Sequence, residues 1–565
     1  MTTKICLLFA AFLFSMPSWA EEIRVSYTFP SVVTDDCYDG TVCRPWHASL
    51  EVRRLPTFPV LPVRVARILV PVSENVVSWT FIPGNATEMS FTPENAELLR
   101  PISKPYNTPR PPARQYFGEE FPSDWVGAGD TLNFRGYKIL QIPLYPFRMK
   151  SEGTAVFITS GELVIETEPT NRNAKELFRK LARDTRDAGI ITDYRERPNE
   201  TYPEGVPGYL IIGPKTLVGE LNQSILSPII NEKKSRGLNV EIANLETISP
   251  KKDPKQIREY IKTRYKAAGI DYVLLVGDKD MLPWKKVQSG LHDDGDPVPT
   301  DQYYACLDGD FGSPEEFDWS CEVAVGRVGV NTPEQLSAWV DKHMQLVQII
   351  KEGRTKQIFN FGEALDGGTF GGRNLDWLET GNGGEPKPPA TVGFPSYTKF
   401  TKLYDSRDGE VSSEQFLSKL SAGDFHVLNH LGHANATFVF KSFMSSLMTD
   451  MPKRPAFYYS EGCYANDPDE DNATITLVRL PKRGPAAMIA NTRYGWYEPG
   501  ESGEGTSSVL HRVFWSMRFK AGIKNLGFMN HKAKEIIIGV TKDPTMVYTL
   551  LESTLIGDPE LNLGI

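Results

Sequence analysis

Short apolar runs alternate with helical patterns along the chain from residue 208 onward. Runs rich in β-branched and aromatic residues predict buried strands at 209–213, 239–244, 272–277, 358–362, 425–431, 456–461 and 486–490. Helical patterns lie between most of these runs, and the clearest follows the capping-box residues Thr332 and Gln335. Alternating strands and helices are typical of parallel sheets. The pattern therefore predicts an α/β fold, a mostly parallel sheet flanked by helices, over residues 208–565.

Residues 21–188 have a different pattern, in which short β-type runs are separated by turns rich in proline. This pattern predicts an all-β N-terminal domain, with a charged amphipathic helix at 173–188 as its last element. The segment 189–207 is polar and rich in proline and glycine, so we predict a linker there. It carries Arg195 and Arg197, which makes it a candidate site of proteolytic cleavage.

The start of the chain has the layout of a secretory signal peptide over residues 1–20. Lys4 is followed by an apolar stretch at 5–14 and by the small-x-small sequence Ser18-Trp19-Ala20. The apolar stretch is too short to cross a bilayer, and no later stretch reaches transmembrane length. We therefore expect export to the periplasm, the cell surface or the medium, without a membrane span.

Composition narrows the class of protein further. The chain has 565 residues, of which 40% are hydrophobic and 24% charged, and this suits a globular protein of two or more domains. Its formal net charge of −9 argues against nucleic acid as a partner.

Five of the six cysteines follow the predicted signal peptide. Export favours disulfides, and two pairs of cysteines are close enough in sequence to close small loops. The predicted disulfides are Cys37–Cys43 and Cys306–Cys321. Cys463 then has no partner, and an unpaired cysteine in an exported protein is a candidate reactive thiol.

Two of the predicted strands, at 425–431 and 456–461, run into loops that carry His433 and Cys463. Catalytic groups gather at the carboxyl ends of the strands of a parallel sheet. We therefore expect a base, His433, to lie beside a nucleophile, Cys463.

The sequence of this region is less consistent with two other chemistries, zinc binding and serine hydrolysis. His426, His430 and His433 suggest zinc, but their spacing differs from the helical His-Glu-x-x-His motif and they fall on a strand and a loop. No Gly-x-Ser-x-Gly sequence surrounds Ser460, which disfavours a serine hydrolase.

A set of motifs in a fixed order is spread over most of the chain. The motifs are Tyr209-Leu210-Ile211-Ile212-Gly213-Pro214, Gly432-His433, Ser460-Glu461-Gly462-Cys463, Asn491-Thr492-Arg493-Tyr494-Gly495-Trp496 and Gly557-Asp558-Pro559-Glu560-Leu561. In these motifs the chain resembles the gingipain-like cysteine peptidases of the caspase-like clan. The resemblance implies a caspase-like fold for residues 208–565 and a gingipain-type pro-segment for residues 21–188. The family's commoner Gly-His-Gly is Gly-His-Ala here, so Ala434 excludes backbone angles open only to glycine.

The resemblance also implies roles for individual residues. Cys463 is the expected nucleophile, His433 assists it, and the backbone N–H groups of Cys463 and Ala434 are the expected oxyanion donors. The family uses an acidic residue to orient the histidine. Asp366 is the better match for that residue, and Glu363 is the alternative.

Two more residues are expected to line the specificity pocket by the same resemblance. Trp496 would form a wall of the pocket, and Asp376 would supply a carboxylate. A carboxylate in the pocket leads us to expect Arg or Lys before the cleaved bond.

Acidic loops raise the question of a metal. The carboxylates of Asp293, Asp294, Asp296, Asp308 and Asp310 suit calcium, which relatives bind, and the competing interpretation is a pair of solvated loops. Cysteine chemistry itself requires no cofactor.

Together these observations predict an exported cysteine endopeptidase that acts on proteins or peptides through Cys463 and His433. We expect it to be made as a zymogen, in which its own N-terminal domain covers the Cys463 cleft. Two alternatives stay open, a non-catalytic surface or adhesion module on the same fold and a thiol transpeptidase. The presence of both His433 and Cys463 favours catalysis over binding alone.

Overall fold

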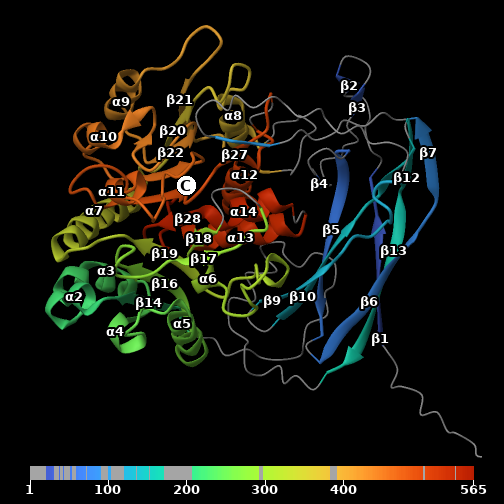
Figure 1. Ribbon diagram of the computed structural model, residues 1–565, viewed down its shortest axis with the longest axis horizontal. Coiled ribbons are helices and arrows are strands. Elements are labelled where there is room, and N and C mark those ends of the chain that lie inside the picture. The colour runs from blue at the N-terminus through green and yellow to red at the C-terminus, as the bar shows by residue number, and fades with distance from the viewer. Residues whose placement is uncertain are drawn as a thin grey trace, which may run out of the picture.

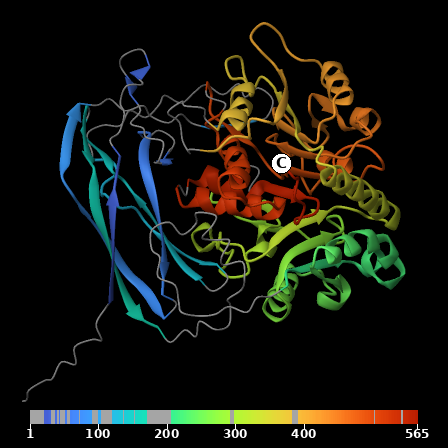
Figure 2. The ribbon, with the colours of Figure 1, turned by 180° about the vertical axis from the view of Figure 1, so that it is seen from behind.

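The computed structural model describes residues 21–30, 59–71, 73–90, 99–102, 120–134, 137–151, 153–170, 206–291, 297–381, 391–500, 503–540 and 543–565, together with the backbone of short strands at 37–38, 42–43 and 51–53. An all-β N-terminal domain lies beside a larger α/β domain (Figures 1 and 2). The fold class predicted from the sequence pattern is confirmed.

The N-terminal domain consists of antiparallel sheets around an apolar core. Its larger sheets contain β1 (Glu21–Thr28), β13 (Ser160–Pro169) and β6 (Glu74–Pro83); β4 (Glu51–Arg53), β5 (Leu61–Val70), β10 (Tyr137–Leu144) and β9 (Asp130–Phe134); and β11 (Phe147–Ser151), β12 (Thr154–Ile158) and β7 (Ala86–Ser90). A hairpin of β2 (Cys37–Tyr38) and β3 (Val42–Cys43) places Cys37 opposite Cys43. The side chains of these two cysteines lie outside the described residues.

The α/β domain is built on a ten-stranded sheet. In spatial order its strands are β15 (Asn239–Asn244), β14 (Gly208–Gly213), β16 (Ile270–Val276), β19 (Ala324–Val328), β28 (Ser553–Ile556), β26 (Ala487–Asn491), β25 (Phe457–Ser460), β22 (Val427–Leu431), β20 (Gln357–Gly362) and β21 (Lys399–Tyr404). The β26–β28 pair is antiparallel, and every other neighbouring pair is parallel. The sheet thus consists of two parallel halves that run in opposite directions.

Helices cover both faces of this sheet (Figure 1). One face packs against α5 (Pro254–Ala268), α8 (Gly372–Thr380), α12 (Thr506–Phe519), α13 (Leu526–Ile538) and α14 (Pro544–Glu552). The other packs against α2 (Lys215–Val218), α3 (Gln223–Ser235), α7 (Pro333–Lys351), α9 (Ser413–Ala422), α10 (Met444–Asp450) and α11 (Ala473–Arg479). Shorter elements are α4 (Leu245–Ile248), α6 (Gln302–Ala305), the 3₁₀ turns at 220–222 and 314–316, β17 (Lys285–Val287), β18 (Val298–Thr300), β23 (Phe438–Val439) and β24 (Ser442–Phe443).

All seven strands expected in this domain are present, to within two residues at each end. Three strands of the ten-stranded sheet were not predicted: β19, β21 and β28. β28 follows α14 directly, without an intervening loop, so its short apolar run reads as part of the helix. β21 is an edge strand with no fully buried residue, and it lacks the apolar run on which the other assignments rest.

The expected helix after Thr332 is α7. Of the two hydrogen bonds of the predicted capping box, only one is present. The Thr332 side chain accepts a hydrogen bond from Gln335 N, whereas the Gln335 side chain accepts from Asn331 N. On the apolar face of α7, Leu336, Val340 and Val347 are buried, and Met344 is partly buried.

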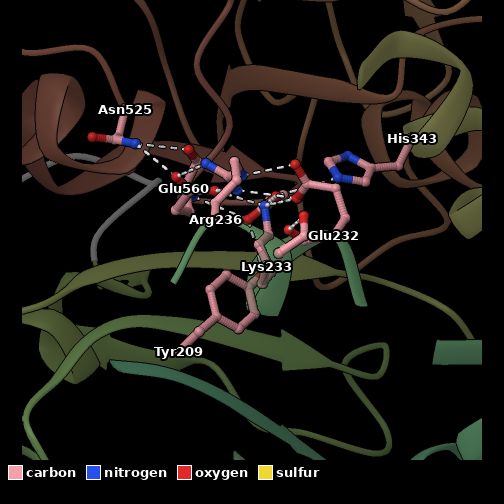
Figure 3. Close-up of polar contacts among 9 residues, drawn as sticks. Tyr209, Glu232, Lys233, Arg236, His343, Asn525 and Glu560 are labelled. Atoms are coloured by element: carbon pink, nitrogen blue, oxygen red, sulfur yellow. Dashed lines mark hydrogen bonds and ion pairs between the residues drawn. The ribbon is translucent and has the colours of Figure 1, made fainter. Parts of the chain in front are cut away.

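A buried cluster of charges ties the C-terminal segment to α3 (Figure 3). Lys233 Nζ donates to Asp558 and lies 2.7 Å from Glu560 Oε2, while Arg236 pairs with Glu232 and Glu560. Burial alone would raise the pKa of Asp558, but the positive charge of Lys233 brings it down to about 2. The Gly-Asp-Pro-Glu-Leu motif is therefore accounted for by packing of the fold.

Further predictions concern the cysteines, the signal peptide and linker, and membrane-spanning helices. Cys306 and Cys321 form the predicted disulfide, and Cys463 is the free cysteine among the described residues. The predicted signal peptide at 1–20, the helix at 173–188 and nearly all of the predicted linker lie outside the described residues. Within the described part of the chain, no helix has the length and apolarity needed to cross a membrane.

Among the described residues, contacts join the two domains near α13 and at β27 (Trp496–Tyr497). Near α13, Arg67 Nη2 donates to Ile536 O at 3.2 Å, and Gln141 lies 3.5 Å from Glu535 O. At the second place, β8 (Arg100–Pro101) of the N-terminal domain pairs with β27 of the α/β domain. This second contact lies at the candidate site.

Candidate active site

Two neighbouring parallel strands deliver His433 and Cys463 to one edge of the sheet. In the register of β22 and β25, His430 is paired with Ser460. His433 follows His430 by three positions, and Cys463 follows Ser460 by three. The two residues therefore extend equally far beyond the same edge, as expected from the sequence.

The loops that carry the two residues are in contact. A Cβ placed on Gly462 would lie 2.5 Å from Ala434 Cβ and 3.4 Å from Ala434 N, so only glycine fits between the loops. Tyr464, directly after Cys463, has φ 54°, a left-handed conformation that is uncommon for a bulky residue. Its N–H donates to Arg493 O at 2.7 Å, which holds the turn after Cys463 in place.

A residue of the N-terminal domain occupies the space between the two loops. Ile102 N donates to Gly495 O at 2.7 Å, and His433 Nδ1 lies 3.2 Å from Ile102 O. Cys463 Sγ lies 3.6 Å from Gly495 O, and the Ile102 backbone is within hydrogen-bonding reach of the thiol. Both candidate catalytic side chains thus meet the main chain of the same residue.

The Cys463 thiol is buried, with 1% of its surface exposed. Burial raises the pKa of the thiol well above its ordinary value, because a thiolate loses its hydration in an apolar setting. In this arrangement the uncharged thiol is favoured, and a thiol is a poor nucleophile.

Glu363, the alternative candidate for orienting the histidine, contacts the strand and the loop that carry His433. Its Oε1 lies 2.9 Å from His430 Nε2, and its Oε2 accepts from the backbone N of His433 at 3.3 Å. A Cβ on Gly432 would lie 2.3 Å from the Glu363 carboxyl carbon, so glycine is required for this close approach. Glu363 fixes the backbone of the histidine loop, whereas the His433 ring faces Ile102.

Asp366, the first choice for the same role, lies in a different environment. Its Oδ1 accepts from the backbone N of Gly368 and of Thr369, and its Oδ2 accepts from the Tyr497 hydroxyl at 3.0 Å. Among the described residues, no carboxylate contacts the His433 ring. The geometry therefore gives no support to Asp366 or Glu363 as a residue that orients the ring directly.

The two residues expected in the specificity pocket lie in different settings. Trp496 is buried in β27, where it faces Pro101 across the strand pair. Asp376 is 47% exposed, pairs with Lys402 at 2.8 Å, and accepts from the Tyr404 hydroxyl at 3.0 Å. Because Asp376 is already paired with Lys402 and Tyr404 and is partly exposed, its geometry does not support a place at the base of a pocket.

A buried polar network below Cys463 was not anticipated from the sequence. Glu461 accepts hydrogen bonds from Ser508 Oγ at 2.6 Å, from His511 Nδ1 at 2.7 Å and from Asn374 Nδ2 at 2.8 Å. These partners come from α8 and α12, far from Glu461 in sequence, so no local pattern reveals them. The one sequence signal for this network is that a charged residue, Glu461, directly follows a buried strand.

The acidic loops expected to bind calcium are only partly described, since residues 292–296 lie outside the described ranges. Of the other candidates, Asp308 pairs with Lys262 at 3.1 Å and Asp310 accepts from Phe311 N at 2.7 Å. The described residues contain no group of three or more His, Cys, Asp or Glu side chains arranged for a metal ion.

A cysteine and a histidine that follow adjacent parallel strands, with their loops in contact, define the class of cysteine peptidases built on an α/β sheet. The chain belongs to peptidase family C25, whose sequence profile matches residues 202–564. It is therefore a gingipain-like member of a family of cysteine peptidases. No curated protein sequence matches the chain significantly.

Solved structures similar to the chain include three of gingipains. The complex of the Porphyromonas gingivalis RgpB pro- and mature domains is 18% identical, with a TM-score of 0.47, over 63% of this chain and 79% of that chain. The Arg-specific cysteine proteinase gingipain R is 18% identical, with a TM-score of 0.47, over 65% and 80%. A structure of P. gingivalis gingipain K, described in terms of zymogenic latency, is 14% identical, with a TM-score of 0.22, over 27% and 90%.

Proposed function

We propose that this protein is an exported cysteine endopeptidase, made as a zymogen, whose N-terminal domain blocks its own active site. The observation that carries the proposal is the position of Ile102. Its main chain lies against His433 and Cys463, at the end of a strand that pairs with β27. A peptide bound for cleavage would need the same place, so substrate and N-terminal domain exclude each other.

The proposed chemistry follows from the two side chains. Once the site is open, the Cys463 thiolate adds to the carbonyl carbon of the substrate, and the N–H groups of Cys463 and Ala434 stabilise the oxyanion. The C–N bond breaks as His433 gives a proton to the leaving amine, which leaves a thioester. Water then attacks the thioester, His433 takes a proton from it, and the acid product departs as the thiol reforms.

The proposed latency has a steric part and an electrostatic part. Ile102 fills the site, and its carbonyl engages His433 Nδ1 at 3.2 Å, so the ring is held by the N-terminal domain. Burial raises the pKa of the Cys463 thiol and so favours its uncharged form, although the Ile102 backbone by itself lowers that pKa. Removal of the segment would hydrate the sulfur and release the histidine together.

Export rests on the sequence of residues 1–20, and the disulfide between Cys306 and Cys321 is consistent with an oxidising destination. Activation by a cut near Arg195 or Arg197 likewise stays a proposal from composition. Asp293, Asp294, Asp296, Asp308 and Asp310 are kept as a possible structural calcium site, with no part in the chemistry.

A peptide-library digestion tests the assignment. The processed wild-type protein should cleave peptides, while Cys463→Ala and His433→Ala proteins, folded as judged by circular dichroism, should not. Cleavage that survives in Cys463→Ala protein would contradict the assignment. Peptide binding without cleavage by the wild type would instead favour a binding module. Products joined to an added amine would favour a transpeptidase.

A further inference from the structure

The segment 99–102 crosses the active site in the manner of a bound peptide. Arg100 is opposite Tyr497 and Pro101 is opposite Trp496 in an antiparallel pair. Strand addition of this kind is a common mode of peptide recognition, in which the main chain supplies affinity and alternate side chains supply specificity. The segment can therefore be analysed position by position for the side chains that the site accepts.

Ile102 stands at the position of the residue before the cleaved bond. Its N–H is bonded to Gly495 O, and its carbonyl lies 3.2 Å from His433 Nδ1. The Cys463 thiol faces the same stretch of backbone. No other residue of the segment reaches both candidate catalytic groups among the contacts of the described residues.

The Ile102 side chain is enclosed by the α/β domain. It is 0% exposed and belongs to one apolar cluster with Leu365, Cys463 and Tyr497. A branched aliphatic group is thus buried completely where the side chain before the cleaved bond would lie. Burial of such an apolar side chain is favourable, and it selects an aliphatic group over a polar one.

Two carboxyl groups near Cys463 bear on whether a basic side chain could be accommodated at this position. Glu461, two residues before Cys463, already accepts three hydrogen bonds from neighbouring side chains. Burial raises the pKa of Glu552 well above its ordinary value, which disfavours its charged form. A guanidinium group buried here without a charged partner would be costly.

Arg100, two positions before Ile102, meets a different environment. Residues two apart on a strand point to the same face, and Arg100 lies directly opposite Tyr497. The Tyr497 hydroxyl donates to Asp366 Oδ2 at 3.0 Å, and the Arg100 guanidinium is within hydrogen-bonding reach of that hydroxyl. Asp366 is held by the backbone N of Gly368 and of Thr369, so its carboxylate is fixed in place facing this position.

Pro101 is consistent with the same register. Because Ile102 N–H points toward β27, the nitrogen of the preceding residue points away from it. Proline lacks an N–H, so it costs no hydrogen bond at this position of an added strand.

We propose that the segment mirrors the enzyme's own substrates, which carry a branched aliphatic residue before the cleaved bond and an arginine or lysine two positions upstream. Tyr497 and Asp366 recognise the upstream basic residue. This inference rests on the proposed peptidase function, and it replaces the expectation that Arg or Lys stands directly before the cleaved bond.

The first test measures access to the thiol in the full-length chain and needs no catalysis. Alkylation of Cys463 by iodoacetamide is followed by mass spectrometry. Ile102→Val protein should be protected like the wild type, whereas Ile102→Arg and Ile102→Asp proteins should react at least ~10-fold faster, because a buried unpaired charge loosens the segment. If Cys463 were protected from alkylation as well in the Ile102→Arg protein as in the wild type, the assignment of an aliphatic side chain to this position would be overturned.

The same assay tests the upstream position through a double-mutant cycle. Arg100→Glu should raise the alkylation rate by about 5-fold, the scale of a partly exposed ion pair. In a protein that already carries Asp366→Asn, the further change Arg100→Glu should have a clearly smaller effect. Equal effects of Arg100→Glu in both backgrounds would overturn the assignment of Asp366.

The second test uses fluorogenic peptides and the processed enzyme. The peptide Leu-Arg-Pro-Ile should be cleaved with a kcat/KM at least ~10-fold above that of Leu-Arg-Pro-Arg, and above that of Leu-Glu-Pro-Ile by about 5-fold. Asp376→Ala protein should keep this order. Preferential cleavage after Arg, lost in Asp376→Ala protein, would overturn the inference while leaving the peptidase function intact. If no peptide is cleaved at all, the proposed function fails, and the alkylation results alone decide the inference.

Discussion

At the scale of single residues, two features define the site. One is the burial of the Cys463 thiol, and the other is the set of groups that the nearby carboxylates contact. Glu363 joins His430 to the loop of His433, and Asp366 joins Tyr497 to a tight turn. Neither carboxylate touches the His433 ring, so both act through the groups that they position. Cys463 is buried, and burial raises the pKa of its thiol.

The pH dependence of alkylation tests the state of that thiol. Burial raises the pKa of Cys463, so at pH 7–9 the thiolate fraction, and with it the rate, should lie far below that of an exposed cysteine, whose pKa is about 8.5. The rate should keep rising above pH 9. In the processed enzyme the same profile should move to lower pH. Profiles that coincide before and after processing would contradict the role given to burial.

Replacing Glu363 by Gln tests its positioning role. A Gln side chain is uncharged and has a single acceptor oxygen, so both partners lose a charged acceptor and one of them loses its acceptor altogether. We expect the free energy of unfolding to fall by about 2 kcal/mol, and kcat to fall more than KM changes. Glu410→Gln is the control, because that carboxylate is 75% exposed on Lys441. A loss in both variants would argue against a specific role.

At the scale of elements, the sheet brings together residues that are distant in sequence. Within this fold, β22 and β25 could be predicted because each is a compact apolar run, and their parallel pairing placed His433 beside Cys463. The network of Glu461 with Ser508, and the strand pairing of Arg100 with Tyr497, could not be predicted. Both join segments with no local pattern in common.

The buried charge cluster on α3 provides a test at this scale. Lys233→Met should lower the free energy of unfolding by about 3–5 kcal/mol, because Asp558 and Glu560 would remain buried without their shared cation. Lys150→Met is the control, since that lysine pairs with Glu88 at an exposed site, and it should change stability by less than about 0.5 kcal/mol. Urea unfolding measures both. Equal effects would contradict the assignment.

Acid should weaken the same cluster. Asp558 has a pKa of about 2 in the folded protein, whereas an unfolded aspartate titrates near 3.9. Its lowered pKa therefore stabilises the fold fully above pH ~4, and this contribution is lost as the pH falls from about 4 to 2. Unfolding at pH 5 and pH 3 should show the loss in the wild type and a smaller one in Asp558→Asn protein.

At the scale of the whole molecule, the proposed latency requires that the N-terminal domain be held against the peptidase domain. The contacts of Arg67 and Gln141 near α13 hold the β-domain in place, while β8 reaches the active site. Because a two-residue strand alone binds weakly, anchorage elsewhere raises its effective concentration at the site. Separation of the domains should therefore release the site at once.

The most direct measurement compares peptide hydrolysis by the same preparation before and after the N-terminal domain is cut away and separated. Activity should rise by at least ~100-fold on separation, in parallel with the reactivity of Cys463, and should stay absent in Cys463→Ala protein. Adding the separated N-terminal domain back should suppress it, and a domain carrying Ile102→Arg should suppress it less. Equal hydrolysis by the intact and the separated forms would contradict the account.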